Sequence, residues 1–387
     1  MRLLIDSTQV PLARTGVGIY AEHLIEELAL LLGSEDTVFV LIQSDDRPMR
    51  ELVAAYPILH PIVISSALFR NRAMLGLYEQ CVLPLVALLY RIDLIHSLHY
   101  TFPLICPSRR VVTIHDLTFS LWPKMHTRAR RIIMPFFTKM ALRRAEGVLF
   151  VSDSTRKDAE QVFGVSRNMR CVIPLGVEDK YFLAVVEAQL ERTILRLGID
   201  RPYVLFLGTL EPRKNVIRLV QAFELVGKQH TEHLLVIVGG LGWHYEPALQ
   251  AIDTSPLKGR IRYLGYISES DKIDLIAGCD LLAYPSLYEG FGLPVLEGMA
   301  VGVPVVTSNI SSLPEVAGDA AILIDPTSVE QIVAAIDSVL SDEIEEDRLR
   351  KAGRERAGHF SWKKTAELTY AAYRTLVANS GSRASKS

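Results

Sequence analysis

Short apolar runs alternate with longer helical patterns along the first half of the chain. The runs are rich in leucine and β-branched residues, which is typical of parallel strands that are buried on both faces. Between them, residues 19–32 and 128–144 have the composition of helices. The pattern therefore predicts an α/β arrangement with strands over residues 2–6, 37–43, 94–98, 109–116 and 147–152.

The same alternation begins again near residue 203. Two successive α/β series predict two doubly wound, Rossmann-like domains with a ligand cleft between them. The pattern loosens over residues 178–201, so we place the domains at 1–185 and 186–364. A last amphipathic helix, at about 365–380, is expected to pack back on the first domain. The second series of strands is expected over residues 203–208, 234–240, 261–265, 279–286, 303–308 and 320–325.

The composition excludes several classes of protein. The chain has 387 residues, of which 49% are hydrophobic, so it is long enough for two folded domains. Its formal net charge of −2 argues against nucleic acid as the main partner. The four cysteines, Cys81, Cys106, Cys171 and Cys279, are too far apart in sequence for a zinc motif. They fit reduced, buried thiols in a cytosolic protein.

The stretch "YEGFGLPVLE" at 288–297 places two carboxylates around two glycines and a proline. We expect Glu289 in a loop at a strand end, because a predicted strand comes directly before it. Pro294 suits the first turn of a helix, which puts Glu297 about one turn further along. Carboxylates there could accept hydrogen bonds from sugar or ribose hydroxyls. The alternative is a capped loop with an exposed acid.

The stretch "GTLEPRKN" follows the first strand of the second series. That strand ends at Gly208, and Arg213 and Lys214 stand near the start of the next helix. A guanidinium fork and an ammonium group side by side can bind a diphosphate. A solvated helix entry is the alternative.

Two patterns in the first half carry weaker signals. In "TGVGIY", Gly16 and Gly18 predict a tight turn at a helix N-terminus, but the full dinucleotide fingerprint is absent. His115 follows a strand and is expected to reach the cleft, or else to be a satisfied structural histidine. Ser152 and Ser154 lie at a strand-to-helix turn, where we expect Ser154 to act as a cap.

Taken together, "GVGIY", "TIHDL", "GTLEPRKN" and "YEGFGLPVLE" resemble the retaining glycosyltransferases of family 4, which have the GT-B fold. The resemblance covers nearly the whole chain. It implies that Arg213 and Lys214 hold the donor diphosphate, that Glu289 faces the donor sugar and that Glu297 binds the ribose. It places His115 near the transferred sugar. It assigns further donor contacts to Gly16, Gly18, Gly208, Tyr266, Ile267, Gly290, Phe291, Gly292 and Leu293.

The resemblance also implies chemistry without a metal or another cofactor. Transfer would retain the anomeric configuration, with a donor phosphate oxygen taking the proton of the acceptor. The sequence is similar to bacterial mannosyltransferases that build O-antigen or exopolysaccharide from GDP-mannose. UDP-glucose, UDP-N-acetylglucosamine and dTDP-rhamnose stay open as donors, and the acceptor is expected to be a glycan or a polyprenyl-linked oligosaccharide. A nucleotide-sugar 2-epimerase fits the motifs less well, and a non-catalytic binding subunit is the other alternative.

Membrane contact is the last expectation from the sequence. The stretch from Lys124 to Arg144 has no acidic residue and mixes basic with large apolar side chains, as a helix on an anionic bilayer would. A partly buried helix with a solvated basic face is an equal alternative. No apolar run is long enough to span a bilayer, and no signal peptide is evident. We expect a cytoplasmic protein, peripheral on the inner membrane if this helix binds lipid.

Overall fold

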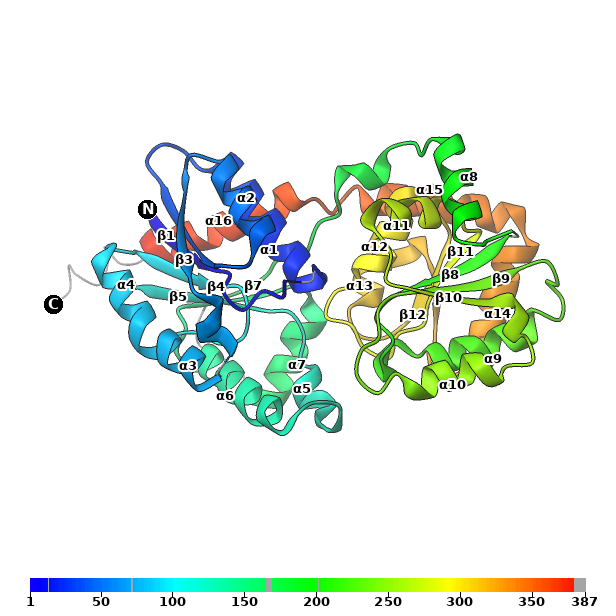
Figure 1. Cartoon of the computed structure of the whole chain (residues 1–387), viewed down its shortest axis with the longest axis horizontal. Helices are drawn as coiled ribbons and strands as arrows, with labels where there is room; N and C mark the ends of the chain where they lie inside the picture. The colour runs from blue at the N-terminus through cyan, green and yellow to red at the C-terminus, as the bar shows by residue number, and fades with distance from the viewer. Residues whose placement is uncertain (13, 71, 165–168, 201, 379–387) are drawn as a thin grey trace. The chain divides into compact units, whose positions relative to one another are not determined.

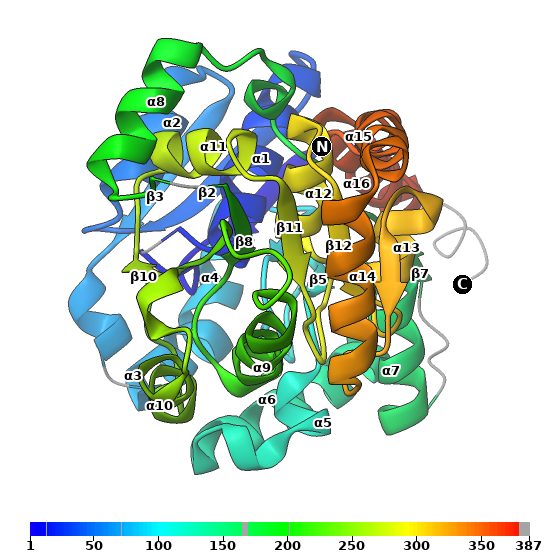
Figure 2. The ribbon, with the colours of Figure 1, turned by 90° about the vertical axis from the view of Figure 1, so that its right-hand side faces the viewer.

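The computed structural model describes residues 1–12, 14–70, 72–164, 169–200 and 202–378. They form two compact units. One is Met1–Gly176 together with the chain from Trp362 onward, and the other is Val177–Ser361. Each unit is built on one parallel sheet with helices packed around it (Figures 1 and 2). The prediction of two doubly wound α/β domains is confirmed.

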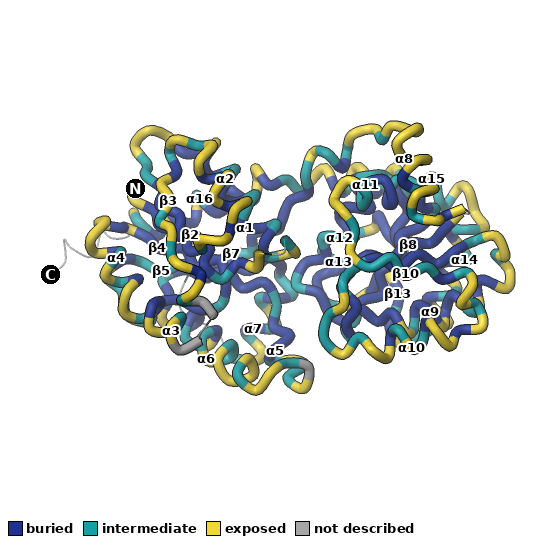
Figure 3. Tube along the Cα trace, viewed as in Figure 1, coloured by how far each residue is buried: buried dark blue, intermediate teal, exposed yellow. Residues whose placement is uncertain are grey.

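The first unit contains a seven-stranded sheet in the order β3-β2-β1-β4-β5-β6-β7, and every pair is parallel. The five predicted strands are present, and most of their side chains are buried, as the dark trace in Figure 3 shows. The order reverses between β1 and β4, where Ile5 lies opposite His96. The strands are β1 (Arg2–Asp6), β2 (Thr37–Gln43), β3 (Leu59–Ile64), β4 (Leu94–Ser97), β5 (Arg109–Ile114), β6 (Gly147–Phe150) and β7 (Met169–Val172).

The two strands that the pattern did not predict, β3 and β7, are the edges of this sheet. Strand β3 contains Pro61, which is tolerated at an edge because no neighbour needs its missing N–H. Side chains in both strands are at least partly exposed at most positions, so neither strand has the continuous apolar run of a central strand.

The helices of the first unit include α1, whose Tyr20, Leu24 and Leu28 are buried. The last helix, α16, belongs to this unit and packs against α1. It ends in the structure at Ala378, so the predicted extension to 380 and the tail beyond it lie outside the described residues. The helices are α1 (Gly16–Leu31), α2 (Arg47–Ala55), α3 (Arg72–Leu77), α4 (Leu83–Leu89), α5 (Thr118–Leu121), α6 (Arg128–Arg144), α7 (Asp153–Phe163) and α16 (Trp362–Ala378), with short turns η1 (Ser66–Arg70), η2 (Tyr78–Val82) and η3 (Pro123–Met125).

The cap of α7 differs from the prediction. The Ser152 hydroxyl, not that of Ser154, accepts the backbone N–H of Thr155 at 3.1 Å. Ser152 has the extended backbone of an N-cap residue, and Ser154 already lies inside the helix.

The second unit has a six-stranded parallel sheet in the order β10-β9-β8-β11-β12-β13. Its strands are β8 (Tyr203–Leu207), β9 (Leu234–Val238), β10 (Ile261–Gly265), β11 (Leu281–Tyr284), β12 (Val305–Ser308) and β13 (Ile322–Ile324), all predicted. Its helices are α8 (Glu187–Arg196), α9 (Val216–Val226), α10 (Glu246–Thr254), α11 (Glu269–Ala277), α12 (Leu293–Val301), α13 (Leu313–Ala317), α14 (Val329–Ser341) and α15 (Glu343–Ala357), with turns η4 (Asp179–Phe182), η5 (Pro212–Lys214), η6 (Lys258–Arg260) and η7 (Gly318–Ala320).

The units divide at Gly176/Val177 and at Ser361/Trp362, not at the predicted 185/186 and 364/365. The reason is the turn η4, which packs against α12 of the second unit. The Tyr181 hydroxyl in that turn donates to Glu269 Oε1 at 2.5 Å, and the Tyr181 ring lies beneath the Lys272 ammonium group. Segment 177–185 is therefore part of the second core.

Two other sequence expectations concern cysteines and membrane spans. All four cysteines are unpaired, and only Cys279 is buried, so the expectation of buried thiols is wrong for the exposed Cys81. Within the described residues, every helix is too short or too polar to cross a bilayer.

Candidate functional site

The sheet of the second unit brings the two strongest motifs to one edge. Strands β8 and β11 are neighbours, and the strand order reverses between them. The segment after β8 carries Arg213 and Lys214, and the segment after β11 carries Glu289. Because the carboxyl ends of parallel strands share one edge, these side chains meet at the topological switch point of the sheet.

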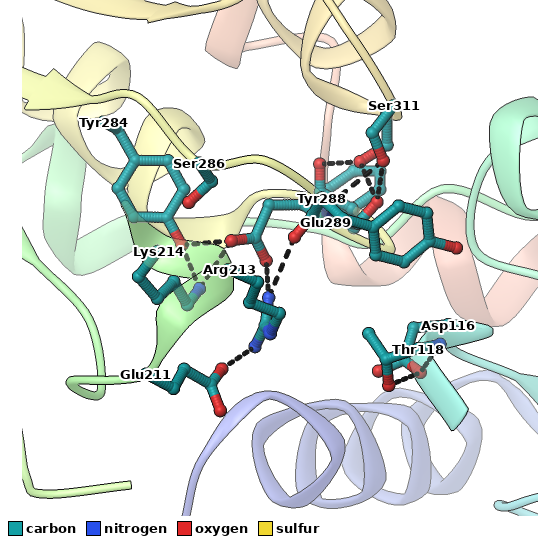
Figure 4. A network of polar contacts seen from close by, with 12 residues as sticks. Asp116, Thr118, Glu211, Arg213, Lys214, Tyr284, Ser286, Tyr288, Glu289 and Ser311 are labelled. Carbon is teal, nitrogen blue, oxygen red and sulfur yellow. Dashed lines mark hydrogen bonds and ion pairs between the residues drawn. The ribbon is translucent and has the colours of Figure 1, made fainter. Parts of the chain in front are cut away.

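Glu289 accepts hydrogen bonds from three side chains (Figure 4). Its Oε1 lies 2.6 Å from Lys214 Nζ and 3.0 Å from the Tyr284 hydroxyl, and its Oε2 lies 2.8 Å from a terminal nitrogen of Arg213. The other terminal nitrogen of Arg213 pairs with Glu211 at 2.5 Å. Two cations and two carboxylates therefore balance one another in this cluster.

Burial and charge act in opposite directions on this cluster. Burial alone would raise the pKa of Glu289, but Arg213 and Lys214 outweigh it and hold the pKa at about 2. Burial and the nearby Arg213 lower the pKa of Lys214, against the pull of Glu289. Both residues are buried, so the alternatives of an exposed acid and a solvated helix entry are wrong for Glu289 and Lys214.

The loop between β11 and α12 is fixed through its backbone. The Ser312 hydroxyl donates to the carbonyls of Glu289 and Phe291 at 2.9 and 2.7 Å, and the Glu289 N–H donates to Ser311 Oγ at 3.1 Å. Gly292 is the N-cap of α12 with φ of +117°, a conformation that favours glycine. Pro294 lies in the first turn of α12, as predicted.

Glu297 is buried on α12 but has different partners. Its Oε1 lies 2.9 Å from the Lys272 ammonium group on α11, which also contacts Glu269 at 3.1 Å. The two glutamates of "YEGFGLPVLE" thus pair with different cations, Glu289 with Arg213 and Lys214 and Glu297 with Lys272. This separation supports different roles for the two glutamates. The sequence pattern did not identify Lys272 as a site residue.

The other predicted donor residues of this unit surround the same edge. Gly208 has φ of +156°, and a Cβ there would lie 3.6 Å from the Lys214 side chain. Tyr266 follows β10 and is 77% exposed, with Ile267 half-buried beside it. The Phe291 ring is buried against Phe360, whereas Gly290 and Leu293 are partly exposed.

The predicted residues of the first unit also follow strand ends. Gly16 and Gly18 form the first turn of α1, and neither has a positive φ, so the helix starts earlier than predicted. A Cβ at Gly18 would lie 3.0 Å from the Arg14 side chain, a tight contact that a small shift of Arg14 would have to relieve.

His115 lies just after β5. Its Nε2 is 2.8 Å from the Leu98 carbonyl, so Nε2 carries a hydrogen and donates. Burial lowers the pKa of His115, which keeps the imidazole neutral. This bond supports the alternative that His115 is a satisfied structural histidine. Its Nδ1 keeps a lone pair that can accept a hydrogen bond from another group. In the next loop, Asp116 accepts from Thr118 (Figure 4).

The described residues contain no group of three or more histidine, cysteine or acidic side chains arranged to hold a metal ion. The one stretch with adjacent aspartates after a strand of the first unit, "SDD" at residues 44–46, has partners for both carboxylates. Asp46 caps α2 by accepting from the Met49 N–H and pairs with Arg14, and Asp45 accepts from Ser66.

Comparison with known proteins places this site in a family. A model for "Glycosyltransferase Family 4" matches residues 14–181, and one for "Glycosyl transferases group 1" matches residues 188–356. The O-antigen chain mannosyltransferase B of Escherichia coli is 34% identical over 271 residues, which cover 70% of this chain and 71% of that protein. The serotype-specific mannosyltransferase WbdA of Escherichia coli is 26% identical over 284 residues, 71% of this chain but only 34% of that longer protein.

The fold has close structural counterparts. Sucrose-phosphate synthase from Thermosynechococcus elongatus superimposes with a TM-score of 0.75 at 22% identity, over 98% of this chain and 99% of that one. Since the first relative exceeds 30% identity over more than two thirds of both chains, the chain belongs to glycosyltransferase family 4 and is a glycosyltransferase with the GT-B fold.

Proposed function

We propose that this enzyme transfers mannose from GDP-mannose, with retention of configuration, to a glycan or polyprenyl-linked oligosaccharide during cell-surface polysaccharide synthesis. The mannosyltransferases named above support the sugar and the pathway class. The observation that carries the mechanism is the Arg213–Lys214–Glu289 cluster at the switch point of the second sheet.

The cluster suits a sugar diphosphate. Phosphate oxygens can replace the Glu289 carboxylate as partners of Arg213 and Lys214, because charge-assisted hydrogen bonds of the same kind are exchanged. The start of α12 adds backbone N–H groups and a positive dipole end. Glu289, once released from the cations, can accept from hydroxyls of the donor sugar, and Glu297 from the ribose.

The chemical step needs no protein nucleophile in this proposal. The bond between the anomeric carbon and the diphosphate oxygen breaks, and a bond from the acceptor oxygen forms on the same face. The acceptor proton passes to the departing diphosphate. Arg213 and Lys214 stabilise the negative charge that develops there, which is the role a metal has in other transferases.

The membrane contact is part of the same proposal. On α6, Ile132 is 71% exposed and Phe136 is 49% exposed, and the basic Arg128, Arg131 and Arg143 are also exposed. Such a surface suits the interface of an anionic bilayer on the cytoplasmic side, where lipid-linked acceptors would be met.

A second exposed apolar face extends this surface. On α4, Leu85, Leu88 and Leu89 are between 58% and 78% exposed. The segment at 102–104 joins this region to α6, since Gln80 bonds the backbone of Phe102 and Leu104, and the Phe102 ring contacts Phe137. The apolar face of α4 carries no charged side chain. The basic residues of α6 therefore favour an anionic lipid surface as the partner of the α4 face.

A panel of GDP-mannose, UDP-glucose, UDP-N-acetylglucosamine and dTDP-rhamnose tests the donor. With octyl α-mannopyranoside as acceptor, only GDP-mannose should release nucleoside diphosphate in an acceptor-dependent reaction, and EDTA should not stop it. NMR of the product should show the α-anomer. Release from another donor would contradict the sugar, and binding without release would indicate a non-catalytic subunit. Loss with EDTA that Mn²⁺ restores would contradict the metal-free step.

The diphosphate contact is tested by Arg213→Ala, with Arg348→Ala as its control. Arg348 is an exposed arginine of the same unit that pairs with Glu345. We expect Arg213→Ala to weaken GDP binding at least tenfold and to lower turnover by orders of magnitude. Equal GDP affinity in the two variants would remove Arg213 from the site.

A further inference from the structure

The sheet of the first unit has its own switch point, between β1 and β4. Asp6 and Ser97 end these strands, and His99 and Thr101 lie in the segment that follows β4. Ligands of doubly wound sheets bind outside the carboxyl ends of the strands at such a point. The reaction chemistry described above uses none of these side chains.

A distortion in a helix brings a carboxyl group to this place. Between α3 and α4 the chain forms the π-helical turn η2 (Tyr78–Val82), and Glu79 within it is only 4% exposed. Single π-helical turns inside α-helices are frequent at functional sites. Glu79 lies close enough to Asp6 for the two carboxyl groups to affect each other's ionisation.

Two polar atoms in this cluster lack a partner. Among the residues that the structure describes, nothing hydrogen-bonds to Glu79 Oε1 or to His99 Nε2, although both residues are more than nine-tenths buried. Leaving a buried polar atom without a hydrogen-bond partner destabilises the folded state. A protein keeps such atoms where a ligand or an ordered water completes them.

Thr101 joins the two residues. Its backbone N–H lies 3.2 Å from His99 Nδ1, and its hydroxyl lies 3.3 Å from the same nitrogen. The Thr101 side chain also lies close enough to Glu79 to lower the pKa of its carboxyl group, and the Gln9 amide donates to the Thr101 hydroxyl at 2.7 Å. Glu79 and His99 therefore converge on one threonine.

The hydrogen on His99 can be assigned from these contacts. Because Nδ1 accepts the Thr101 N–H, the neutral ring carries its hydrogen on Nε2, so the unpartnered Nε2 is a donor. Burial lowers the pKa of His99 to about 3, with a further contribution from the neighbouring His115. Burial, with a contribution from Asp6, raises the pKa of Glu79 to about 8.

The cluster thus presents one N–H donor and one carboxyl oxygen, both uncharged near neutral pH. Among the described residues, no cation contributes to the pKa shifts of Glu79 and His99, so a phosphate is less suited to this cluster than to Arg213 and Lys214. A sugar hydroxyl fits, because it accepts one hydrogen bond and donates another.

We propose that His99 Nε2–H and Glu79 Oε1 bind hydroxyl groups of the acceptor sugar and select it. This inference rests on the proposed transferase function, since it assigns the acceptor contacts of that reaction. His115, the histidine that the family resemblance puts near the transferred sugar, is near enough to His99 to lower its pKa, so these hydroxyls would lie in the same region of the first unit.

The test compares Glu79→Gln and His99→Leu with the wild-type full chain. Octyl α-mannopyranoside is the acceptor and GDP-mannose the donor. We expect the acceptor KM to rise at least tenfold in each variant, while GDP affinity by calorimetry, which belongs to the other unit, stays unchanged. His99→Gln keeps an N–H donor and should lose less than His99→Leu. Glu51→Gln, which removes an exposed carboxylate of the same unit, should keep the wild-type KM.

The alternative is that a trapped water completes the two atoms. In that case Glu79→Gln changes the melting temperature but leaves the acceptor KM at the wild-type value, and the proposal is wrong. A second measurement is independent of turnover. Saturation-transfer NMR should detect methyl α-mannopyranoside on the wild type and not on His99→Leu. Equal signals, or none on the wild type, would also overturn the proposal.

Failure of the proposed function would look different. If GDP-mannose is not the donor, the wild type and all variants fail together in the turnover assay. The NMR comparison then still decides the roles of Glu79 and His99. A variant that does not fold is recognised by its melting curve, and the other variant then carries the test.

Discussion

The Lys214 ammonium group lies 2.6 Å from Oε1 of Glu289, and each residue is 7% exposed. The pair is therefore a buried salt bridge, in which either charge without the other is strongly unfavourable. Arg213, which contacts the second oxygen of Glu289, can compensate only in part. The candidate donor site is consequently also a structural element of its unit.

This pair predicts an energetic coupling between Lys214 and Glu289. Lys214→Met should destabilise the second unit by about 3 kcal/mol, because it leaves a buried carboxylate with one cation. The double variant Lys214→Met/Glu289→Gln should be more stable than the sum of the single variants by about 1–3 kcal/mol. Hydrogen exchange of strand β8 measures the stability of this unit by itself. Additive effects would mean that the two charges do not stabilise each other.

A second prediction separates the two glutamates. Glu289→Gln frees Arg213 and Lys214 for phosphate, so affinity for free GDP should stay the same or rise while turnover falls by orders of magnitude. Glu297→Gln should instead weaken GDP binding, because Glu297 is assigned to the ribose. Calorimetry with GDP, alongside turnover, distinguishes the variants. The opposite pattern would mean that the two roles are reversed.

The sequence predicts the central strands of both sheets and the edges of the second, but it misses both edges of the first sheet. Strands such as β1 and β8 are buried on both faces, so their apolar runs carry the signal by themselves. Strand β3 has Pro61 and exposed side chains, and the short β7 has only half-buried ones, so neither resembles a buried strand. The units divide at Gly176/Val177 because η4 is joined to the second unit by contacts distant in sequence, such as Tyr181 with Glu269, which the chain pattern does not reveal.

The same limit applies to the site. Arg213, Lys214 and Glu289 stand in motifs with glycine and proline at fixed positions, so they could be identified. Lys272 and Glu79 could not be identified, because a single charged residue in a helix has no local signature. Their significance arises from burial and from partners elsewhere in the chain. The exposed face of α4 was missed as a surface because an apolar run predicts burial.

A third prediction concerns the membrane. Leu85→Glu/Leu88→Glu changes two exposed side chains of α4, so stability should change little. Binding to vesicles of phosphatidylcholine with phosphatidylglycerol should fall more than about tenfold, because two apolar groups are lost and two negative charges are gained.

The control is Leu195→Glu, a leucine of the second unit that is even more exposed, at 78%; this variant should bind vesicles like the wild type. Reversal of Arg128 and Arg131 should weaken binding mainly at low salt, since screening removes this contribution. If the wild type does not bind anionic vesicles, both surfaces are ordinary solvated helices.

The last prediction uses the raised pKa of Glu79, which is about 8 in the folded chain against an ordinary value of 4.5. Between these values the folded state keeps a proton that the unfolded state loses. The contribution of Glu79 to stability is therefore greatest below pH 4.5 and falls as the pH rises toward 8, by at most about 1.4 kcal/mol per pH unit. Glu79→Gln cannot titrate, so its stability should lack this component, although the raised pKa of Asp6 affects both proteins.

Unfolding of the first unit can be followed by fluorescence in a Trp243→Phe background, because Trp122 and Trp362 then report on that unit alone. As the pH rises from 4.5 to 8, the Glu79→Gln variant should become more stable relative to the chain that keeps Glu79. Parallel curves would show that Glu79 is ionised in the folded protein and that the cluster carries a negative charge.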